Sequence, residues 1–329
     1  MQKTARYSDI YIILTPLHFI VSYNMYLRGG VAQQKKTLFV VVDNFNFLKI
    51  LNILNIKMPS DRVKIFPGDR HSNRFIRVGR TLFSYSLSAC QSDNVFIFND
   101  SSFRVQSFLS RITSNRVILV EEGLAPYAAP TFRHNYFHRA FASISKKYIS
   151  CDLGFSGLYD HYFIVNPEKA YKKLDRDKIK KIDVEFFKYD SGQEIHRDEI
   201  VLITSPVYDN VNELTVASYL SQIELAINEI KRPIYFKFHP LERPSLYSSL
   251  VERYSDFVTV LNPVLPTNCF LFDRNAILVS FSMSSAFQYA DCKKYLINLA
   301  GYDLNLDHDL LAHFNVSVLG IADFLYEVF

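Results

Sequence analysis

Short runs of Val, Ile, Leu and Phe recur through the first two-fifths of the chain, each followed by a longer stretch with apolar positions at helical spacing. Continuous apolar runs are typical of strands that are covered on both faces. The expected strands are 10–14, 37–42, 63–66, 95–98 and 117–120, and the expected helices are 17–27, 45–54, 74–88 and 103–112. This alternation predicts a parallel, doubly wound α/β sheet.

The same rhythm returns after residue 200. The expected strands are 200–204, 234–238, 257–260, 276–280 and 295–299, with helices at 211–230 and 284–290 and a strand and helix within 316–329. The charge-rich stretch 169–181 and the polar stretch 191–198 are interpreted as an inter-domain linker with its flanks. We predict two Rossmann-type domains, 1–190 and 191–329, that face each other across a ligand-binding cleft.

Composition narrows the function classes. The chain has 49% hydrophobic residues, enough for two cores, and no Trp, so a sugar-binding module built on Trp platforms is not expected. Its 37 basic and 33 acidic residues give a net charge of only +4, which disfavours a nucleic-acid partner. The four cysteines lack metal-ligand spacing and predict reduced, buried thiols. The polar start and the absence of about 20 consecutive apolar residues predict a cytoplasmic protein whose membrane contact, if any, is peripheral. The oligomeric state stays open.

Four polar groups follow expected strands, where doubly wound folds bind ligands. Glu121, Glu122 and Gly123 come directly after strand 117–120. Adjacent carboxylates at a strand end raise at least one pKa, which suits a general base, and Gly123 permits a sharp turn. Taken alone, the pair also fits a solvated acidic loop.

Lys237, His239 and Pro240 end strand 234–238. Pro240 stops the strand, and His239 could donate to a phosphate or protonate a leaving group near neutral pH. Lys237 would share a face with His239 if the strand continued. A strand-end histidine that bonds its own loop is the simpler alternative.

Ser282, Ser284 and Ser285 stand between strand 276–280 and a helix. Hydroxyls and free amides at a helix start form an anion site, although plain capping by one serine is commoner. Thr204 and Ser205 occupy the matching place after strand 200–204 and would help to hold the donor.

Thr15, Pro16 and His18 follow the first strand. Thr15 is expected to cap the helix, with Pro16 at its first position. His18 either faces the cleft or is a satisfied polar residue on the helix. The two D-x-D sequences, at 175–177 and 307–309, are assigned to a solvated linker and a helix cap, so no metal site is predicted.

The order of an acid-acid-Gly turn, an H-P pair and a Ser-Ser pair resembles the bacterial GT-B-fold sialyltransferases of glycosyltransferase families 52 and 38, which include lipooligosaccharide and capsule enzymes. The resemblance implies a GT-B-like fold and inverting, metal-independent transfer of sialic acid from CMP-sialic acid to a glycan acceptor. The first-strand loop of those enzymes often ends in Gln, where this chain has His18.

The resemblance also implies individual roles. Glu121 would be the general base, with Glu122 as the second choice. His239 would contact the CMP phosphate and help it to leave, with Lys237 near the nucleotide. Ser284 and Ser285 would hold the phosphate.

Three alternatives stay open on the residues alone. The donor could be another CMP-nonulosonic acid, CMP-Kdo or a UDP-hexose. The chain could be a non-catalytic nucleotide-sugar-binding module. It could also be a nucleotide-sugar epimerase or hydrolase on the same fold.

Overall fold

The structure is a computed structural model that divides into two compact units, Met1–Phe187 and Lys188–Phe329. The domain boundary predicted from the sequence lies between residues 190 and 191. The described residues are 5–34, 36–43, 45–67, 90–99, 105, 108–109, 111–121, 126–127, 159–184, 195, 198–207, 214–230, 232–239, 242–270, 276–282, 284, 286–289, 292–299 and 308–328. The expected helix at 74–88 and half of the one at 103–112 lie outside them.

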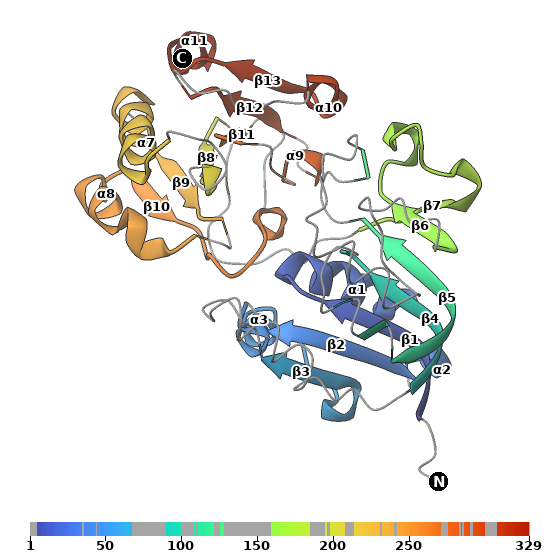
Figure 1. Ribbon diagram of the computed structural model, residues 1–329. Helices are drawn as coiled ribbons and strands as arrows, with labels where there is room; N and C mark the ends of the chain where they lie inside the picture. The colour runs from blue at the N-terminus through green and yellow to red at the C-terminus, as the bar shows by residue number, and fades with distance from the viewer. Residues whose placement is uncertain are drawn as a thin grey trace. The chain divides into compact units, whose positions relative to one another are not determined.

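The first unit contains a seven-stranded sheet in the order β3-β2-β1-β4-β5-β6-β7, with every pair parallel (Figure 1). Its strands are β1 (Ala5–Ile13), β2 (Thr37–Asp43), β3 (Val63–Pro67), β4 (Cys90–Ile97), β5 (Ile112–Val120), β6 (His161–Ile164) and β7 (Ile179–Lys181). Its described helices are α1 (Pro16–Arg28), α2 (Val31–Gln34) and α3 (Phe47–Ile53).

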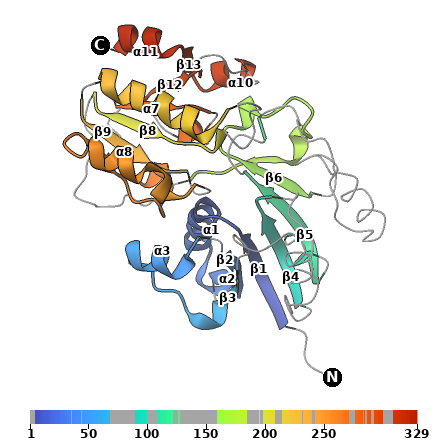
Figure 2. The ribbon, with the colours of Figure 1, turned by 60° about the vertical axis from the view of Figure 1, so that its left-hand side comes forward.

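The second unit contains a six-stranded parallel sheet in the order β10-β9-β8-β11-β12-β13. Its strands are β8 (Ile200–Ile203), β9 (Ile234–Lys237), β10 (Val258–Val260), β11 (Ile277–Ser280), β12 (Lys293–Ile297) and β13 (Val316–Leu319). Its described helices are α7 (Val216–Ile230), α8 (Ser248–Arg253), α9 (Ala286–Tyr289), α10 (His308–His313) and α11 (Ile321–Val328). In Figure 2, α7 runs along this sheet, and α11 packs against α7, β12 and β13.

Both sheets reverse their strand order once. The chain moves outward from β1 to β3 and then restarts beside β1 with β4, and it repeats this path from β8 to β10 and then to β11. The predicted doubly wound α/β architecture is therefore confirmed for each unit. Ligands of such sheets bind beyond the carboxyl ends of the two strands that flank the reversal, here β1 with β4 and β8 with β11.

The interpretation of 169–181 as a linker is wrong. This stretch contains the short helices η2 (Pro167–Lys169) and η3 (Arg176–Lys178) and the edge strand β7, which pairs with β6. Leu174 and Ile182 anchor it through buried side chains, while Lys180 and Lys181 are exposed. Lysines on a short edge strand keep the edge from pairing with other chains. Because they also interrupt the apolar run, hydrophobicity does not predict this strand.

Several strands also begin earlier than their apolar runs. β4 begins at Cys90 and β5 at Ile112, and the two pair in parallel from these residues onward. Their first residues mix polar and apolar types, so pairing with neighbours, and not hydrophobicity, sets these boundaries. The expected helix at 103–112 is therefore wrong at Ile112, the first residue of β5.

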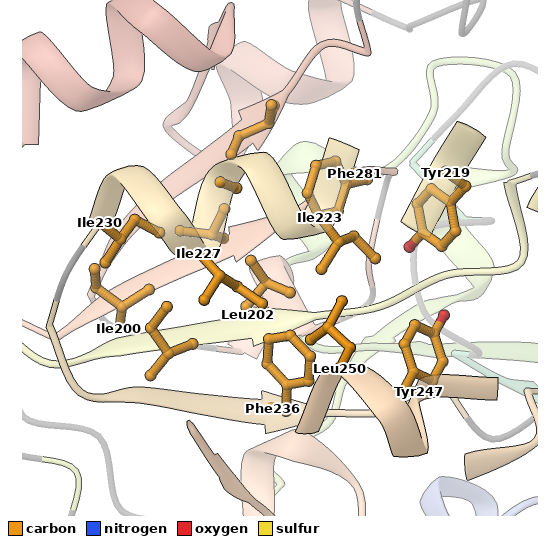
Figure 3. Packing of buried hydrophobic residues seen from close by; sticks show 14 of the residues in the cluster. Ile200, Leu202, Tyr219, Ile223, Ile227, Ile230, Phe236, Tyr247, Leu250 and Phe281 are labelled. Carbon is orange, nitrogen blue, oxygen red and sulfur yellow. The ribbon is translucent and has the colours of Figure 1, made fainter. Parts of the chain in front are cut away.

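The core of the second unit shows why α7 lies on the sheet. Ile223, Ile227 and Ile230 recur at helical spacing and are almost fully buried, and they point toward Ile200 and Phe236 of the sheet (Figure 3). Each such side chain contributes about 1.5–3 kcal/mol by leaving water. This packing fixes the strands whose carboxyl ends carry the candidate site.

Candidate active site

Glu121 is a buried carboxylate at the carboxyl end of β5. Only 2% of the residue is exposed, and its N–H donates to Phe163 O at 2.9 Å, which extends the pairing of β5 with β6. Its Oε2 accepts a 2.7 Å hydrogen bond from the N–H of Val165, which follows β6. The carboxylate therefore bridges the ends of two neighbouring strands.

A tyrosine completes this arrangement. The Tyr127 hydroxyl donates to Oε2 of Glu121 at 2.5 Å and accepts from the N–H of Asn166 at 3.1 Å. Tyr127 is 5% exposed. Two donors on one carboxylate oxygen fix the orientation of the side chain, as a positioned base requires. No local pattern in the sequence marks Tyr127, because a spacing of six residues from Glu121 is typical of no regular element.

Removing the hydroxyl of Tyr127 tests this support. We expect Tyr127→Phe to lower the free energy of unfolding by about 1–3 kcal/mol, since a buried hydrogen bond to a carboxylate is lost. Denaturant titration measures the change, and Tyr326→Phe, on a ring that is 92% exposed, is the matched control. Equal stability of Tyr127→Phe and the control would contradict the described hydrogen bond.

The first-strand loop is held by its own residues. Thr15 caps α1 by accepting from His18 N–H at 3.2 Å, and Pro16 is the first helical residue, as predicted. The His18 ring is fully buried, lies 4.4 Å from the Phe98 ring at an interplanar angle of 9°, and accepts from Leu14 N–H through Nδ1 at 3.2 Å. His18 therefore packs between the ends of β1 and β4, and its role toward a ligand stays a prediction.

Lys237 is the last residue of β9, and its side chain is turned into the core of the second unit. It is 2% exposed, and Nζ donates at 3.2 Å to the carbonyl oxygens of Phe238 and Pro263. Burial lowers the pKa of Lys237 to about 8, and the nearby Cys269 opposes this shift. Burial likewise raises the pKa of the Cys269 thiol to about 12. The contact of Lys237 with a nucleotide stays a prediction.

His239 lies beyond the strand, in the turn after β9, which is hydrogen-bonded to the loop after β8. Its N–H lies 3.2 Å from Thr204 Oγ1 and 3.3 Å from Glu242 Oε2, and its carbonyl accepts from Glu242 N–H at 2.9 Å. Thr204 itself follows β8 and donates to Glu242 Oε2. The sequence analysis missed Glu242, although its place three residues after His239 is the spacing of a side chain that reaches back to a backbone N–H.

Two serines meet at the strand reversal of the second sheet. A 2.7 Å hydrogen bond joins the hydroxyl oxygens of Ser205, after β8, and Ser282, after β11. Ser205 N–H also donates to Tyr219 OH of α7 at 3.0 Å. Ser284 Oγ accepts from Ala286 N–H at 3.2 Å at the start of α9, which is the capping contact. The structure thus brings Thr204, Ser205 and Ser282 to one end of one sheet.

Some predicted site residues lie outside the described residues, namely Glu122, Gly123, Pro240 and Ser285. In the part of the chain that is described, no group of three or more His, Cys, Asp or Glu residues could hold a metal ion. Asp175 Oδ1 accepts from Asp177 N–H at 3.2 Å and caps η3. Metal independence stays a prediction.

A family model now adds to this geometry. The model described as alpha-2,8-polysialyltransferase (POLYST) matches residues 10–294, a range that contains all the candidate residues above. The chain belongs to the alpha-2,8-polysialyltransferase family. The predicted resemblance to sialyltransferases is thereby confirmed, and the chain is a glycosyltransferase by family. No curated protein sequence matches it.

Solved structures with low sequence identity share the fold of this polysialyltransferase-family chain. UGT89C1 of Arabidopsis thaliana complexed with UDP has a TM-score of 0.56 at 10% identity, covering 98% of this chain and 90% of that one. UDP-GlcNAc 2-epimerase of Neisseria meningitidis bound to UDP-GlcNAc has a TM-score of 0.52 at 12% identity, covering 97% and 90%. The enzyme of the same name from Methanocaldococcus jannaschii, in complex with UDP-GlcNAc and UDP, has 0.52 at 13%, covering 97% and 91%. The predicted two-domain, GT-B-like α/β fold is confirmed.

Within the described residues of this family member, no helix is long and apolar enough to cross a membrane.

Proposed function

We propose that this polysialyltransferase-family member transfers sialic acid from CMP-sialic acid to a hydroxyl of a glycan acceptor, with inversion and without a metal ion. The observation that carries the proposal is the family match over residues 10–294, which includes the candidate residues of both units. The name of the family supports an acceptor that itself ends in sialic acid, as in a bacterial surface polysaccharide. In this proposal the N-terminal unit binds the acceptor and carries the general base, and the C-terminal unit binds the donor.

The acceptor side of the reaction requires a base. In the proposed mechanism Glu121 takes the proton of the acceptor hydroxyl as that oxygen attacks the anomeric carbon of the donor. The contacts that Tyr127 and Val165 make with Oε2 support this role, because they hold the carboxylate in one orientation. A positioned base of this kind contributes about 10²–10⁴-fold to the rate.

The donor side requires a site for the leaving phosphate. As the new glycosidic bond forms, the bond between the anomeric carbon and the CMP oxygen breaks, and CMP departs with the bonding electrons. His239, Ser284 and Ser285 would stabilise the departing phosphate through hydrogen bonds. The meeting of Ser205 and Ser282 at the strand reversal supports a nucleotide site there, since doubly wound sheets bind ligands at such points.

The structural relatives favour one alternative donor. UGT89C1 and the two epimerases are complexed with uridine nucleotides or UDP-sugars, on a fold that this chain shares. A UDP-sugar enzyme, either a transferase or an epimerase, is therefore the second candidate. The two candidates differ in the nucleobase of the donor, which is cytosine in the first candidate and uracil in the second.

Calorimetric titration with CMP and with UDP, in the presence of EDTA, tests the donor. We expect CMP to bind more tightly than UDP, and His239→Ala to weaken CMP binding about ten-fold, since a hydrogen bond to a charged phosphate is lost. The turn should survive this substitution, because the backbone N–H and C=O of His239, which the alanine variant keeps, form hydrogen bonds in it.

His308→Ala, on an exposed histidine at the start of α10, is the matched control and should bind CMP like the wild type. A preference for UDP would favour the second candidate. Unchanged CMP binding by His239→Ala would remove His239 from the proposed mechanism.

A further inference from the structure

Glu242 is a buried carboxylate to which the proposed mechanism gives no role. It is 6% exposed, and burying an acidic side chain costs free energy unless hydrogen bonds compensate. Glu242 stands just before the short helix η5 (Pro244–Tyr247). Acidic side chains are rarely buried unless they are paired, so its contacts indicate what it does.

One oxygen of Glu242 connects two loops. Oε2 accepts a hydrogen bond from the Thr204 hydroxyl and lies 3.3 Å from the N–H of His239. The same N–H lies 3.2 Å from Thr204 Oγ1, so the three groups form a closed triangle. Thr204 is fully buried, and its own N–H donates to Lys237 O at 3.0 Å.

The other oxygen of Glu242 is anchored in the core. Oε1 accepts from the Tyr247 hydroxyl at 2.5 Å, and Tyr247 is fully buried. Burial first, and then the neighbouring Tyr219 and Glu242, raise the pKa of Tyr247, so its hydroxyl stays protonated and donates. The hydroxyl groups of Tyr219 and Tyr247 point toward each other (Figure 3), and Tyr219 OH in turn accepts from Ser205 N–H. A core tyrosine therefore anchors Oε1, while Oε2 contacts the two loops.

These contacts link the segments that carry the proposed donor contacts. The loop after β8 holds Thr204 and Ser205, and Ser205 reaches Ser282 after β11. The turn after β9 holds His239. Glu242 adds a side-chain link between this turn and the loop after β8, beside the bond of Thr204 Oγ1 with His239 N–H and the backbone bond to Lys237.

We propose that Glu242 is a positioning residue that locks the His239 turn to the Thr204–Ser205 loop and so preorganises the nucleotide site. The inference rests on the proposed function of that site as a nucleotide site. It holds whether the nucleotide carries cytosine or uracil. Preorganised loops bind more tightly because less ordering is left to occur on binding. Glu242 therefore acts through the two loops.

Three variants separate positioning from general stability. Glu242→Met removes both hydrogen-bonding oxygens at similar volume. Glu242→Gln keeps an oxygen toward Thr204 and His239 and an amide toward Tyr247, whose hydroxyl can accept. Tyr247→Phe removes the hydroxyl that anchors Oε1 but none of the three groups of the triangle, and it is the matched stability control.

We expect Glu242→Met to raise the Kd for CMP by about ten-fold or more, and Glu242→Gln and Tyr247→Phe to stay within about three-fold of the wild type. Hydrogen exchange of the His239 N–H should accelerate in Glu242→Met and not in Tyr247→Phe. If Glu242→Met does not fold, Thr204→Val breaks the same triangle from the other side and should weaken binding similarly.

Two results would overturn the assignment while leaving the proposed function intact. One is wild-type CMP affinity in Glu242→Met or in its substitute Thr204→Val. The other is equal weakening in Tyr247→Phe at equal loss of stability, which would make the effect one of folding alone. Binding of UDP in place of CMP would refute the proposed donor, and the same variants titrated with UDP would then decide the role of Glu242. A wild-type protein that binds neither nucleotide would overturn both proposals.

Discussion

Replacing Glu121 with glutamine should lower the turnover number of sialyl transfer by about 10²–10⁴-fold, the usual contribution of a general base. Glutamine has the size of glutamate, and its carbonyl oxygen can accept from Tyr127 and Val165 in place of Oε2. The fold and the binding of CMP should therefore persist. What the variant loses is an atom basic enough to take the acceptor proton.

Steady-state kinetics with a saturating donor measures the loss, and thermal denaturation checks the fold. Glu168→Gln makes the same chemical change on an exposed glutamate of the same unit and should retain full turnover. Near-normal turnover of Glu121→Gln would refute the assignment of the base. The corresponding variant of Glu122 would then be the next to test.

Lys237→Met should change how stability depends on pH. The pKa of Lys237 is about 8 in the folded protein and near 10.5 when the chain is unfolded, because burial disfavours the charged form. Below about pH 8 both states are protonated, and the buried charge is a constant penalty. As the pH rises from 8 toward 10.5, the folded protein releases this proton first, so the wild type gains stability relative to the variant.

The gain should reach about 3 kcal/mol, since each unit of pKa difference corresponds to about 1.4 kcal/mol. Denaturant titrations of both proteins at pH values from 7 to 10 measure it. Lys293→Met, on an exposed lysine of β12, is the control and should run parallel to the wild type. A constant difference between the wild type and Lys237→Met would show that the ammonium group is not buried as described.

The sequence predicted the two sheets because their central strands are continuous apolar runs. β1, β2, β8 and β11 are buried along most of their length, and parallel strands of this kind need no polar face. β6 and β7 were missed for the opposite reason. They are short and lie at or next to the sheet edge, and β7 carries two exposed lysines.

The candidate site was predictable where contacts are local. The cap formed by Thr15 on α1 spans three residues, so the sequence order alone reveals it. The expected shared face of Lys237 and His239 assumed that the strand continued, and β9 ends at Lys237. Tyr127 and Glu242 acquire their roles from contacts that are distant along the chain, 39 residues between Tyr127 and Asn166 and 38 between Thr204 and Glu242. No periodicity encodes such contacts.

A product assay with CMP-sialic acid, α2,8-linked oligosialic acid and EDTA, in which mass spectrometry follows the acceptor, tests sialyl transfer directly. We expect acceptors lengthened by sialic acid, release of one CMP per residue added, and transfer by Glu121→Gln slowed about 10²–10⁴-fold. Transfer from a UDP-sugar but not from CMP-sialic acid, across a panel of glycan acceptors, would contradict the proposed function.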